Sequence, residues 1–277
     1  MPKVSVILPA YNCAKYLSDS LSSVLSQTFG DLEVVLVDDG STDATEALVA
    51  ERFRDPRIRY IKQEHLGLSY SRNHGIDKAM GELVAFIDAD DIFLNNKIER
   101  QVLAFERHMG TEVVYTSEKY FYGGNKDALV ESPHEKLSGD LLFFLKRSNF
   151  IHISTVMARR STVKDIRFDP ALKSHEDWDF FLKLSAQGRR FFCLPEALSL
   201  IRIRQKSMTA ESSVMDSSRA IVGERAKELW NDLKRGIGMA SHEGISSLSR
   251  YLWLKARAGL LNFPNAPRFN RPTLFNK

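Results

Sequence analysis

Short runs of apolar, mostly β-branched residues alternate with longer amphipathic stretches through the first half of this chain. The runs lie at Val4 to Leu8, Glu33 to Val37, Ile58 to Ile61, Leu83 to Ile87 and Glu112 to Thr116. A strand that is apolar at nearly every position is typical of a parallel sheet, because helices bury both of its faces. The sequence therefore predicts an α/β fold with a mostly parallel, Rossmann-like sheet and helices on both faces.

The stretches between the runs predict the helices. Apolar residues recur at helical spacing over residues 17–25, and Asn12 ahead of them is the expected N-terminal cap. Further helices are predicted over Asp43 to Arg52, Ser69 to Met80 and Asn95 to His108. Later elements are predicted at Gly139 to Lys146 (helix), Ser154 to Ala158 (strand) and from Glu176 (helix). A Gly123-Gly124-Asn125 turn between the two halves predicts a hairpin or loop.

Beyond residue 210 the sequence becomes Ser-rich and then helical, over Ser218 to Lys234 and Ile245 to Asn262. We predict an α/β domain over residues 1–210 and a helical extension over 211–277. Within the domain, residues 1–117 and residues 118–210 are expected to form two halves.

The extension also holds the excess positive charge, with 11 Lys and Arg against 6 Asp and Glu from residue 211 onward. Two interpretations of residues 245–263 stay open. In the first, the segment contacts a membrane interface, where its Lys and Arg residues attract anionic lipid. In the second, its apolar stripe packs on the domain or forms a homodimer. No nucleic-acid partner is expected.

Cellular location is predicted from what the sequence lacks. No apolar run approaches the roughly 18 residues of a spanning helix, and Met1-Pro2-Lys3 leads directly into a strand. Cys13 and Cys193 have no metal-binding spacing and are expected to be buried thiols in a reducing compartment. We therefore expect a cytoplasmic protein, working free or at the inner face of the membrane.

Acidic residues follow the predicted strands at the edge where an open parallel sheet binds ligands. Asp38-Asp39-Gly40-Ser41-Thr42-Asp43 follows the second strand and Asp88-Ala89-Asp90-Asp91 the fourth, whereas Pro9-Ala10-Tyr11-Asn12 follows the first. That first turn has no glycine, which excludes a dinucleotide-binding fingerprint, and no Walker P-loop occurs.

Clustered carboxylates repel one another unless a cation binds them. Oxygen ligands favour Mg²⁺ or Mn²⁺, which can bridge to substrate phosphates. The alternative is that these Asp residues only cap helices.

Five ordered segments resemble the family 2 glycosyltransferases, which have the GT-A fold: VSVILPAYN from Val4, VDDGSTD from Val37, SRNHG from Ser71, FIDADD from Phe86 and HEDWDF from His175. The resemblance covers about residues 3–205 and excludes the extension. It implies that residues 1–117 bind the nucleotide and that residues 118–210 carry the acceptor and catalytic groups. It implies an inverting, metal-dependent, hexosyltransferase-like enzyme that uses a nucleoside-diphosphate sugar of the UDP or dTDP type. The acceptor is expected to be a saccharide or lipid-linked hydroxyl in cell-surface polysaccharide or glycolipid assembly.

The resemblance also implies a role for each matching residue in nucleotide binding. Pro9, Ala10 and Tyr11 line the nucleoside pocket, and Asp39 accepts from the uracil or thymine imide. Arg72 contacts the base or the diphosphate.

Asp88 approaches the ribose. Asp90 binds Mn²⁺ or Mg²⁺ directly, and Asp91 supports it or caps a helix. Asp177 is the general base for the acceptor hydroxyl, and its place near a helix N-terminus is expected to keep it ionised. Arg204 stands where many members carry a histidine and is expected to pair with the diphosphate.

Simpler roles remain open for several of these residues. Asp39 and Asp43 are suited to capping a helix, which for Asp43 is the favoured interpretation. Arg72 is suited to pairing with a nearby carboxylate. Glu176 and Asp179 are alternatives to Asp177, and Trp178 is expected in the core.

Two other functions are weighed against glycosyl transfer. A nucleotidyltransferase needs a glycine-rich basic loop after the first strand, which is missing here. A catalytically idle nucleotide-sugar scaffold need not keep Asp88, Asp90 and Asp177 together. Glycosyl transfer is therefore the leading prediction.

Overall fold

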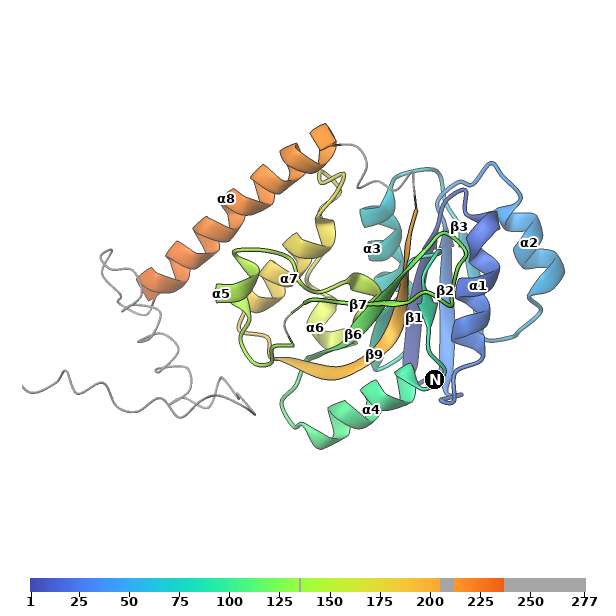
Figure 1. Ribbon diagram of the computed structural model, residues 1–277, viewed down its shortest axis with the longest axis horizontal. Coiled ribbons are helices and arrows are strands. Elements are labelled where there is room, and N and C mark those ends of the chain that lie inside the picture. The colour runs from blue at the N-terminus through green and yellow to red at the C-terminus, as the bar shows by residue number, and fades with distance from the viewer. Residues whose placement is uncertain (135, 205–211, 237–277) are drawn as a thin grey trace, which may run out of the picture.

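Four parallel strands form the N-terminal part of the central sheet. A computed structural model describes residues 1–134, 136–204 and 212–236 (Figure 1). In spatial order these strands are β3 (Ile58–Lys62), β2 (Leu32–Asp38), β1 (Val4–Ala10) and β4 (Leu83–Phe86). All their carboxyl ends therefore lie at one edge of the sheet, as the apolar runs predicted.

The rest of the sheet is mixed. Next to β4, β8 (Val156–Arg159) runs antiparallel, followed by β6 (Val113–Tyr122), β9 (Phe191–Ile203) and β5 (Ile92–Phe93). Both β6 and β9 run in the direction of β4, and β7 (Val130–Glu131) forms a hairpin with β6 after the predicted glycine turn. The α/β fold class is confirmed, and the antiparallel strands β8, β5 and β7 are the departures from a parallel sheet.

Helices cover both faces of the sheet because neighbouring strand residues point to opposite sides. Val6 and Leu8 pack with α1 (Ala14–Leu25), α2 (Thr45–Arg52) and α4 (Lys97–Arg107). Ile7 packs in the opposite core. The helices of that face are α3 (Leu68–Lys78), α5 (Leu142–Leu145), α6 (Arg160–Val163), α7 (Glu176–Ala186) and α8 (Ser212–Gly236). A 3₁₀ turn, η1 (Ile153–Thr155), precedes β8.

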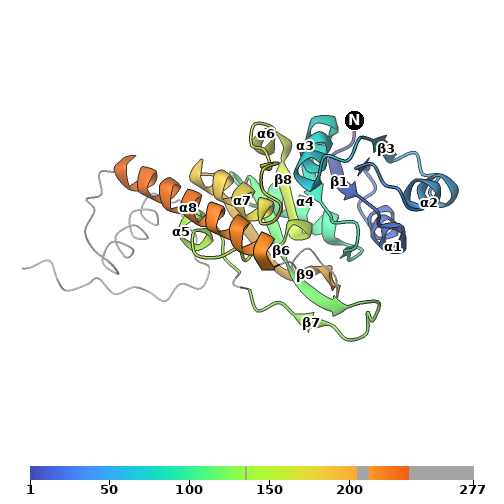
Figure 2. The ribbon, with the colours of Figure 1, turned by 90° about the horizontal axis from the view of Figure 1, so that it is seen from above.

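The last described helix, α8, packs against α5 and α7 at the end of the molecule away from α1 and α2 (Figure 2). Val222 and Ala226 are fully buried in this contact, and Arg225 pairs with Asp169 at 2.6 Å and with Asp179 at 3.0 Å. The helix predicted over 218–234 is thus confirmed, whereas the stretch over 245–262 lies outside the described residues. No helix in the described ranges combines the length and apolar character needed to cross a bilayer.

The proposed division of the chain at residue 210 falls in the undescribed segment 205–211, so that boundary stays a prediction. The division at residue 117 falls within β6 and stays a prediction too. Strand β6 itself is longer than predicted, ending at Tyr122 rather than Thr116.

The expected cap at Asn12 is wrong, and Asp43 takes its place. The Asn12 side chain accepts hydrogen bonds from the Thr42 and Asp43 N–H groups rather than from α1. Asp43 instead accepts from the N–H of Ala14, the first residue of α1, at 3.1 Å. It also accepts from the N–H of Thr45, the first residue of α2, at 2.9 Å. The interpretation of Asp43 as a capping residue is therefore confirmed, and it serves two helices.

We expect Asp43→Ala to lower the free energy of unfolding by about 1–2 kcal/mol, since two first-turn N–H groups lose their acceptor. Urea unfolding followed by circular dichroism measures the change. Asp165→Ala is the matched control, because Asp165 is exposed and forms no described side-chain bond. Equal stability of the two variants would contradict the double-cap assignment.

Candidate functional site

The candidate site lies at the sheet edge where the carboxyl ends of β1, β2 and β4 meet. Because β8 runs against β4, the residue just before η1 and β8 lies at this same edge. Because β6 and β9 run with β4, their last residues also lie there. The edge therefore collects side chains from both halves of the sequence.

The loop after β4 carries the three predicted acids, Asp88, Asp90 and Asp91. Asp91 is buried and accepts from Ser154 Oγ at 2.6 Å and from the Arg202 N–H at 3.0 Å. The Asp88 N–H donates to the same Ser154 hydroxyl at 3.0 Å. The loop is thus fixed onto the start of β8 and the end of β9.

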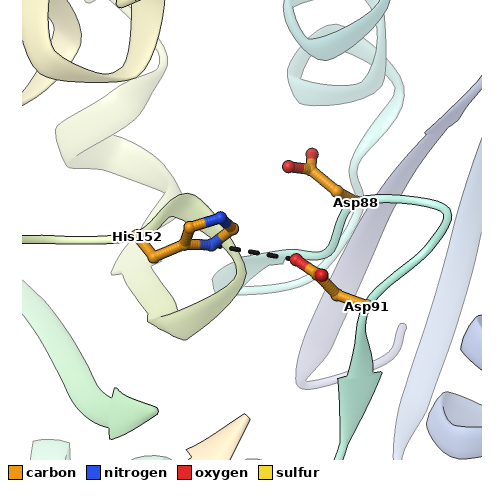
Figure 3. Close-up of side chains that lie close together, drawn as sticks. All are labelled: Asp88, Asp91 and His152. Carbon is orange, nitrogen blue, oxygen red and sulfur yellow. Dashed lines mark ion pairs between the residues drawn. The ribbon is translucent and has the colours of Figure 1, made fainter. Parts of the chain in front are cut away.

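Asp88, Asp91 and His152 form a group able to hold a cation (Figure 3). One ligand atom of each lies within 4.8 Å of the others, and His152 Nδ1 is 3.8 Å from Asp91 Oδ2. Two carboxylates and an imidazole are a donor set that suits Mn²⁺ and tolerates Mg²⁺. The residues present therefore fit a divalent ion.

His152 is not among the residues predicted from the sequence. It lies just before the predicted strand at 154–158, and a residue before a strand reaches this edge only if the strand is antiparallel to β4. The sequence carries no direct sign of that direction.

Asp90, the predicted metal ligand, lies outside this three-residue group and pairs with Arg204. The Arg204 Nε atom is 2.7 Å from Asp90 Oδ2. Both residues belong to the same edge, one after β4 and one after β9. Their predicted contacts with metal and diphosphate stay predictions.

The three acids differ in their pKa values because their counter-charges differ. Burial favours the neutral form of Asp88, but the nearby Arg72 guanidinium outweighs it and lowers the pKa. Burial and the negative charge of Asp88 raise the pKa of Asp90 against the opposing effect of Arg204. Burial raises the pKa of Asp91 well above its ordinary value, and the charges of the other two acids add to the effect.

Arg72 joins this loop to the amino end of α7. Its guanidinium is 2.7 Å from Asp88 Oδ1 and 2.5 Å from Glu176 Oε1, and the side chain is almost fully buried. It also lies 5.3 Å from the centre of the Phe168 ring. These contacts agree with the interpretation that Arg72 pairs with nearby carboxylates.

Of the three acids that begin α7, Asp177 is the one without an ion pair in the described parts of the chain. Glu176 pairs with Arg72, and Asp179 pairs with Lys183 at 2.6 Å and with Arg225. Within the described residues, the hydrogen bonds that Asp177 accepts come from neutral donors, Asn149 Nδ2 at 3.2 Å and the Trp178 N–H at 2.7 Å.

The environment of Asp177 differs from the expected one. Burial, reinforced by the charge of Glu176, raises the pKa of Asp177 to about 6 despite its place at a helix N-terminus. The carboxylate is then mostly ionised at neutral pH, as expected, yet able to take up a proton. Trp178 is buried and donates from Nε1 to the Leu145 carbonyl at 2.6 Å, which confirms its place in the core.

The residues predicted for the nucleoside lie at the ends of β1 and β2. Pro9 and Ala10 are buried, whereas Tyr11 is 45% exposed and stacks on His65 with ring centroids 3.9 Å apart. Asp39 is buried and close to this stack, with its carboxylate 2.9 Å from His65 Nδ1.

Both carboxylate oxygens of Asp39 accept hydrogen bonds within the protein. The donors are Gln63 Nε2 at 2.7 Å, the Leu66 N–H at 3.0 Å and the Gly67 N–H at 2.8 Å. Burial by itself favours protonation, but these bonds outweigh it and lower the pKa of Asp39. Asp39 thus shapes the segment between β3 and α3, and its contact with a base stays a prediction.

An open α/β sheet with an acidic, cation-compatible loop at the carboxyl ends of its strands is an arrangement suited to a nucleotide-dependent enzyme. The sequence model of the family described as "Glycosyl transferase family 2" matches residues 5–167 of this chain. An uncharacterized glycosyltransferase of Haemophilus influenzae is 32% identical over 76% of this chain and 83% of its own length. The chain belongs to glycosyltransferase family 2.

More distant similarities extend the comparison. Chondroitin synthase of Escherichia coli is 29% identical over 68% of this chain, which matches only 27% of that protein. The structure of Staphylococcus aureus TarS residues 1–349 in complex with UDP-GlcNAc has a TM-score of 0.64 and 25% identity, covering 82% of this chain and 70% of TarS 1–349.

A mannosyltransferase from Pyrobaculum calidifontis in complex with GDP-Man and Mn²⁺ shares the fold. Its TM-score is 0.58 at 16% identity, and the match covers 92% of this chain and 81% of that one. The GT-A fold expected from the sequence motifs is confirmed.

Loss of Arg72 is expected to be costly because two carboxylates stay behind without their cation. Arg72→Met should lower the free energy of unfolding by about 3–5 kcal/mol, measured by urea titration. Adding Glu176→Gln should recover part of the loss, since one of the two charges is then removed. If Arg72→Met alone is as stable as the wild type, the ion pairs of Arg72 with Asp88 and Glu176 do not stabilise the fold.

Proposed function

We propose that this protein transfers a hexose from a UDP- or dTDP-sugar to an acceptor hydroxyl with inversion at the anomeric carbon. The observation that carries the proposal is Asp177, which has no ion pair within the described ranges. Its neighbour Glu176 is linked to Asp88 of the acidic loop through Arg72. A single displacement needs a base for the acceptor hydroxyl on one side of the sugar and a site for the leaving diphosphate on the other side.

The donor class is supported by the family and by its neighbours. TarS is solved with UDP-GlcNAc. The exposed Tyr11 ring offers a stacking surface for a base, and the acidic loop at the same sheet edge would hold a divalent ion suited to a diphosphate. A saccharide or lipid-linked acceptor in polysaccharide or glycolipid assembly is proposed from the likeness to a chondroitin synthase.

Asp177 acts as the base in this proposal. Its pKa of about 6 leaves it ionised at neutral pH and close enough to neutrality to accept the acceptor proton efficiently. Glu176 and Asp179 are already bound to cations, which leaves Asp177 for the acceptor hydroxyl.

The proposed metal is Mn²⁺ or Mg²⁺, bound at the group of Asp88, Asp91 and His152 and completed by Asp90. When bound, the ion supplies a Lewis acid that stabilises the negative charge of the leaving diphosphate. Arg204 is a second cation at the same edge and is suited to the same leaving group.

Asp177→Asn is expected to lower turnover by about two to four orders of magnitude, the usual contribution of a positioned base. UDP affinity, measured by calorimetry, should stay nearly unchanged because Asp177 does not face the nucleotide in this proposal. A variant that keeps most of its activity, alongside an inactive Glu176→Gln, would move the base role to Glu176.

The pH profile of kcat/KM should follow the ionisation of Asp177. The base works only when ionised, so the rate should fall about tenfold per pH unit below about 6 and level off above pH 7. In Asp177→Asn the residual activity should lose this acidic limb. A profile of the wild type that stays flat down to pH 5 is incompatible with the assignment.

Mn²⁺ or Mg²⁺ should raise the affinity for UDP or dTDP, as measured by calorimetry with the ion and with a chelator. Asp90→Ala should abolish the increment and His152→Ala should reduce it. Equal UDP affinity of the wild type in chelator and in Mn²⁺ would refute metal-assisted donor binding.

A further inference from the structure

The acidic loop carries its own counter-charges. Asp88 is paired with Arg72 inside the protein, and Asp90 is paired with Arg204. The Asp90 oxygen that lies 2.7 Å from Arg204 Nε is therefore covered by a positive group. A divalent ion and this guanidinium repel each other, so the ion cannot gain the full benefit of Asp90 while Arg204 stays in place.

The two arginines at the end of β9 are held very differently. The Arg202 guanidinium is 3% exposed, pairs with Asp19 at 2.8 Å and donates to the Asp90 carbonyl at 2.9 Å. It also lies 4.5 Å from the centre of the Phe121 ring. Arg202 is thus a fixed part of the loop's support.

Arg204 has few restraints by comparison. Its side chain is 38% exposed, and in the described residues its one ion pair is that with Asp90. Among the residues that the structure describes, its Nε atom has no well-aligned hydrogen-bond acceptor in spite of the short distance to Asp90. The ring of Tyr16, 5.6 Å away, is its aromatic neighbour. This guanidinium is therefore able to move while Arg202 keeps the loop in place.

We propose that Arg204 is an exchangeable counter-ion, which neutralises Asp90 in the free protein and moves to the diphosphate when the donor binds. A guanidinium binds phosphate oxygens well, so the move keeps Arg204 paired. It also frees the Asp90 carboxylate for the metal. Donor and metal then bind cooperatively, each favouring the state in which Arg204 has left Asp90. This inference rests on the proposed function for its donor and deepens it.

The test measures Mn²⁺ binding directly, by electron paramagnetic resonance and calorimetry, with and without UDP. Without UDP, Arg204→Gln should bind Mn²⁺ roughly tenfold or more tightly than the wild type, because a neighbouring positive charge is removed. Arg204→Lys keeps the charge and should resemble the wild type. Arg100→Gln, which breaks a surface pair with Glu196, is the matched control and should leave Mn²⁺ affinity unchanged.

Repeating the Arg204→Gln substitution in an Asp90→Asn variant shows whether the gain in Mn²⁺ affinity depends on Asp90. Asp90→Asn should cancel the gain, so that the double variant Asp90→Asn/Arg204→Gln binds Mn²⁺ no more tightly than Asp90→Asn alone. With UDP present, the factor by which the nucleotide raises Mn²⁺ affinity should be smaller in Arg204→Gln than in the wild type.

Unchanged Mn²⁺ affinity of Arg204→Gln without UDP would overturn the proposal, and so would a gain that persists in the Asp90→Asn background. Failure of the proposed function has a different signature. In that case the wild type binds neither UDP nor dTDP and transfers no sugar, while the measurements without nucleotide still decide the role of the Arg204 and Asp90 pair.

Discussion

The bridge that Arg72 forms between Asp88 and Glu176 holds the site together. These carboxylates belong to a loop after β4 and to the start of α7, and Arg72 itself belongs to α3. A buried guanidinium has to be paired, and here both partners come from distant segments. The acidic loop and the helix that presents Asp177 are therefore joined by one polar side chain, in addition to the packing of Phe86 in β4 against Phe180 in α7.

The same bridge explains the different behaviour of neighbouring acids. Arg72 pairs with both Glu176 and Asp88, and its positive charge helps to lower the pKa of Asp88. Asp177, one residue further, feels the burial and the charge of Glu176 without a cation of its own, and its pKa rises. Glu176 and Asp177 are adjacent in the sequence but differ in their environments, because Arg72 pairs with Glu176 and not with Asp177.

The N-terminal half of the fold was predictable because its strands are apolar at nearly every position and lie parallel. That pattern alone placed the acids after β2 and β4 at a common edge. The contribution of the C-terminal half was not predictable, because it depends on the direction of β8. Nothing in the residues of a four-residue strand indicates whether it runs with or against β4, so His152 was missed.

The side-chain hydrogen bonds at the helix ends could not be predicted from the hydrophobic pattern either. Asn12 and Asp43 are both good caps by residue type, and only the folded turn shows that Asp43 reaches both helices. Strand β9 was not predicted, and Pro195 and Glu196 interrupt its pairing with β6. Proline at an irregular point of a strand is tolerated, but sequence patterns treat it as an end.

That interruption sets which face of the sheet the end of β9 presents. Leu194 is opposite Thr116, yet the next pairs are Ala197 with Ser117 and Ser199 with Glu118, so β9 contains extra residues here. Side chains alternate along a strand, and a shift by one residue reverses every one that follows. A single deletion within this bulge, with the pairing at Phe191 kept, would turn Arg202 and Arg204 away together. The length of an irregular segment thereby governs the charge of a site at the far end of the strand.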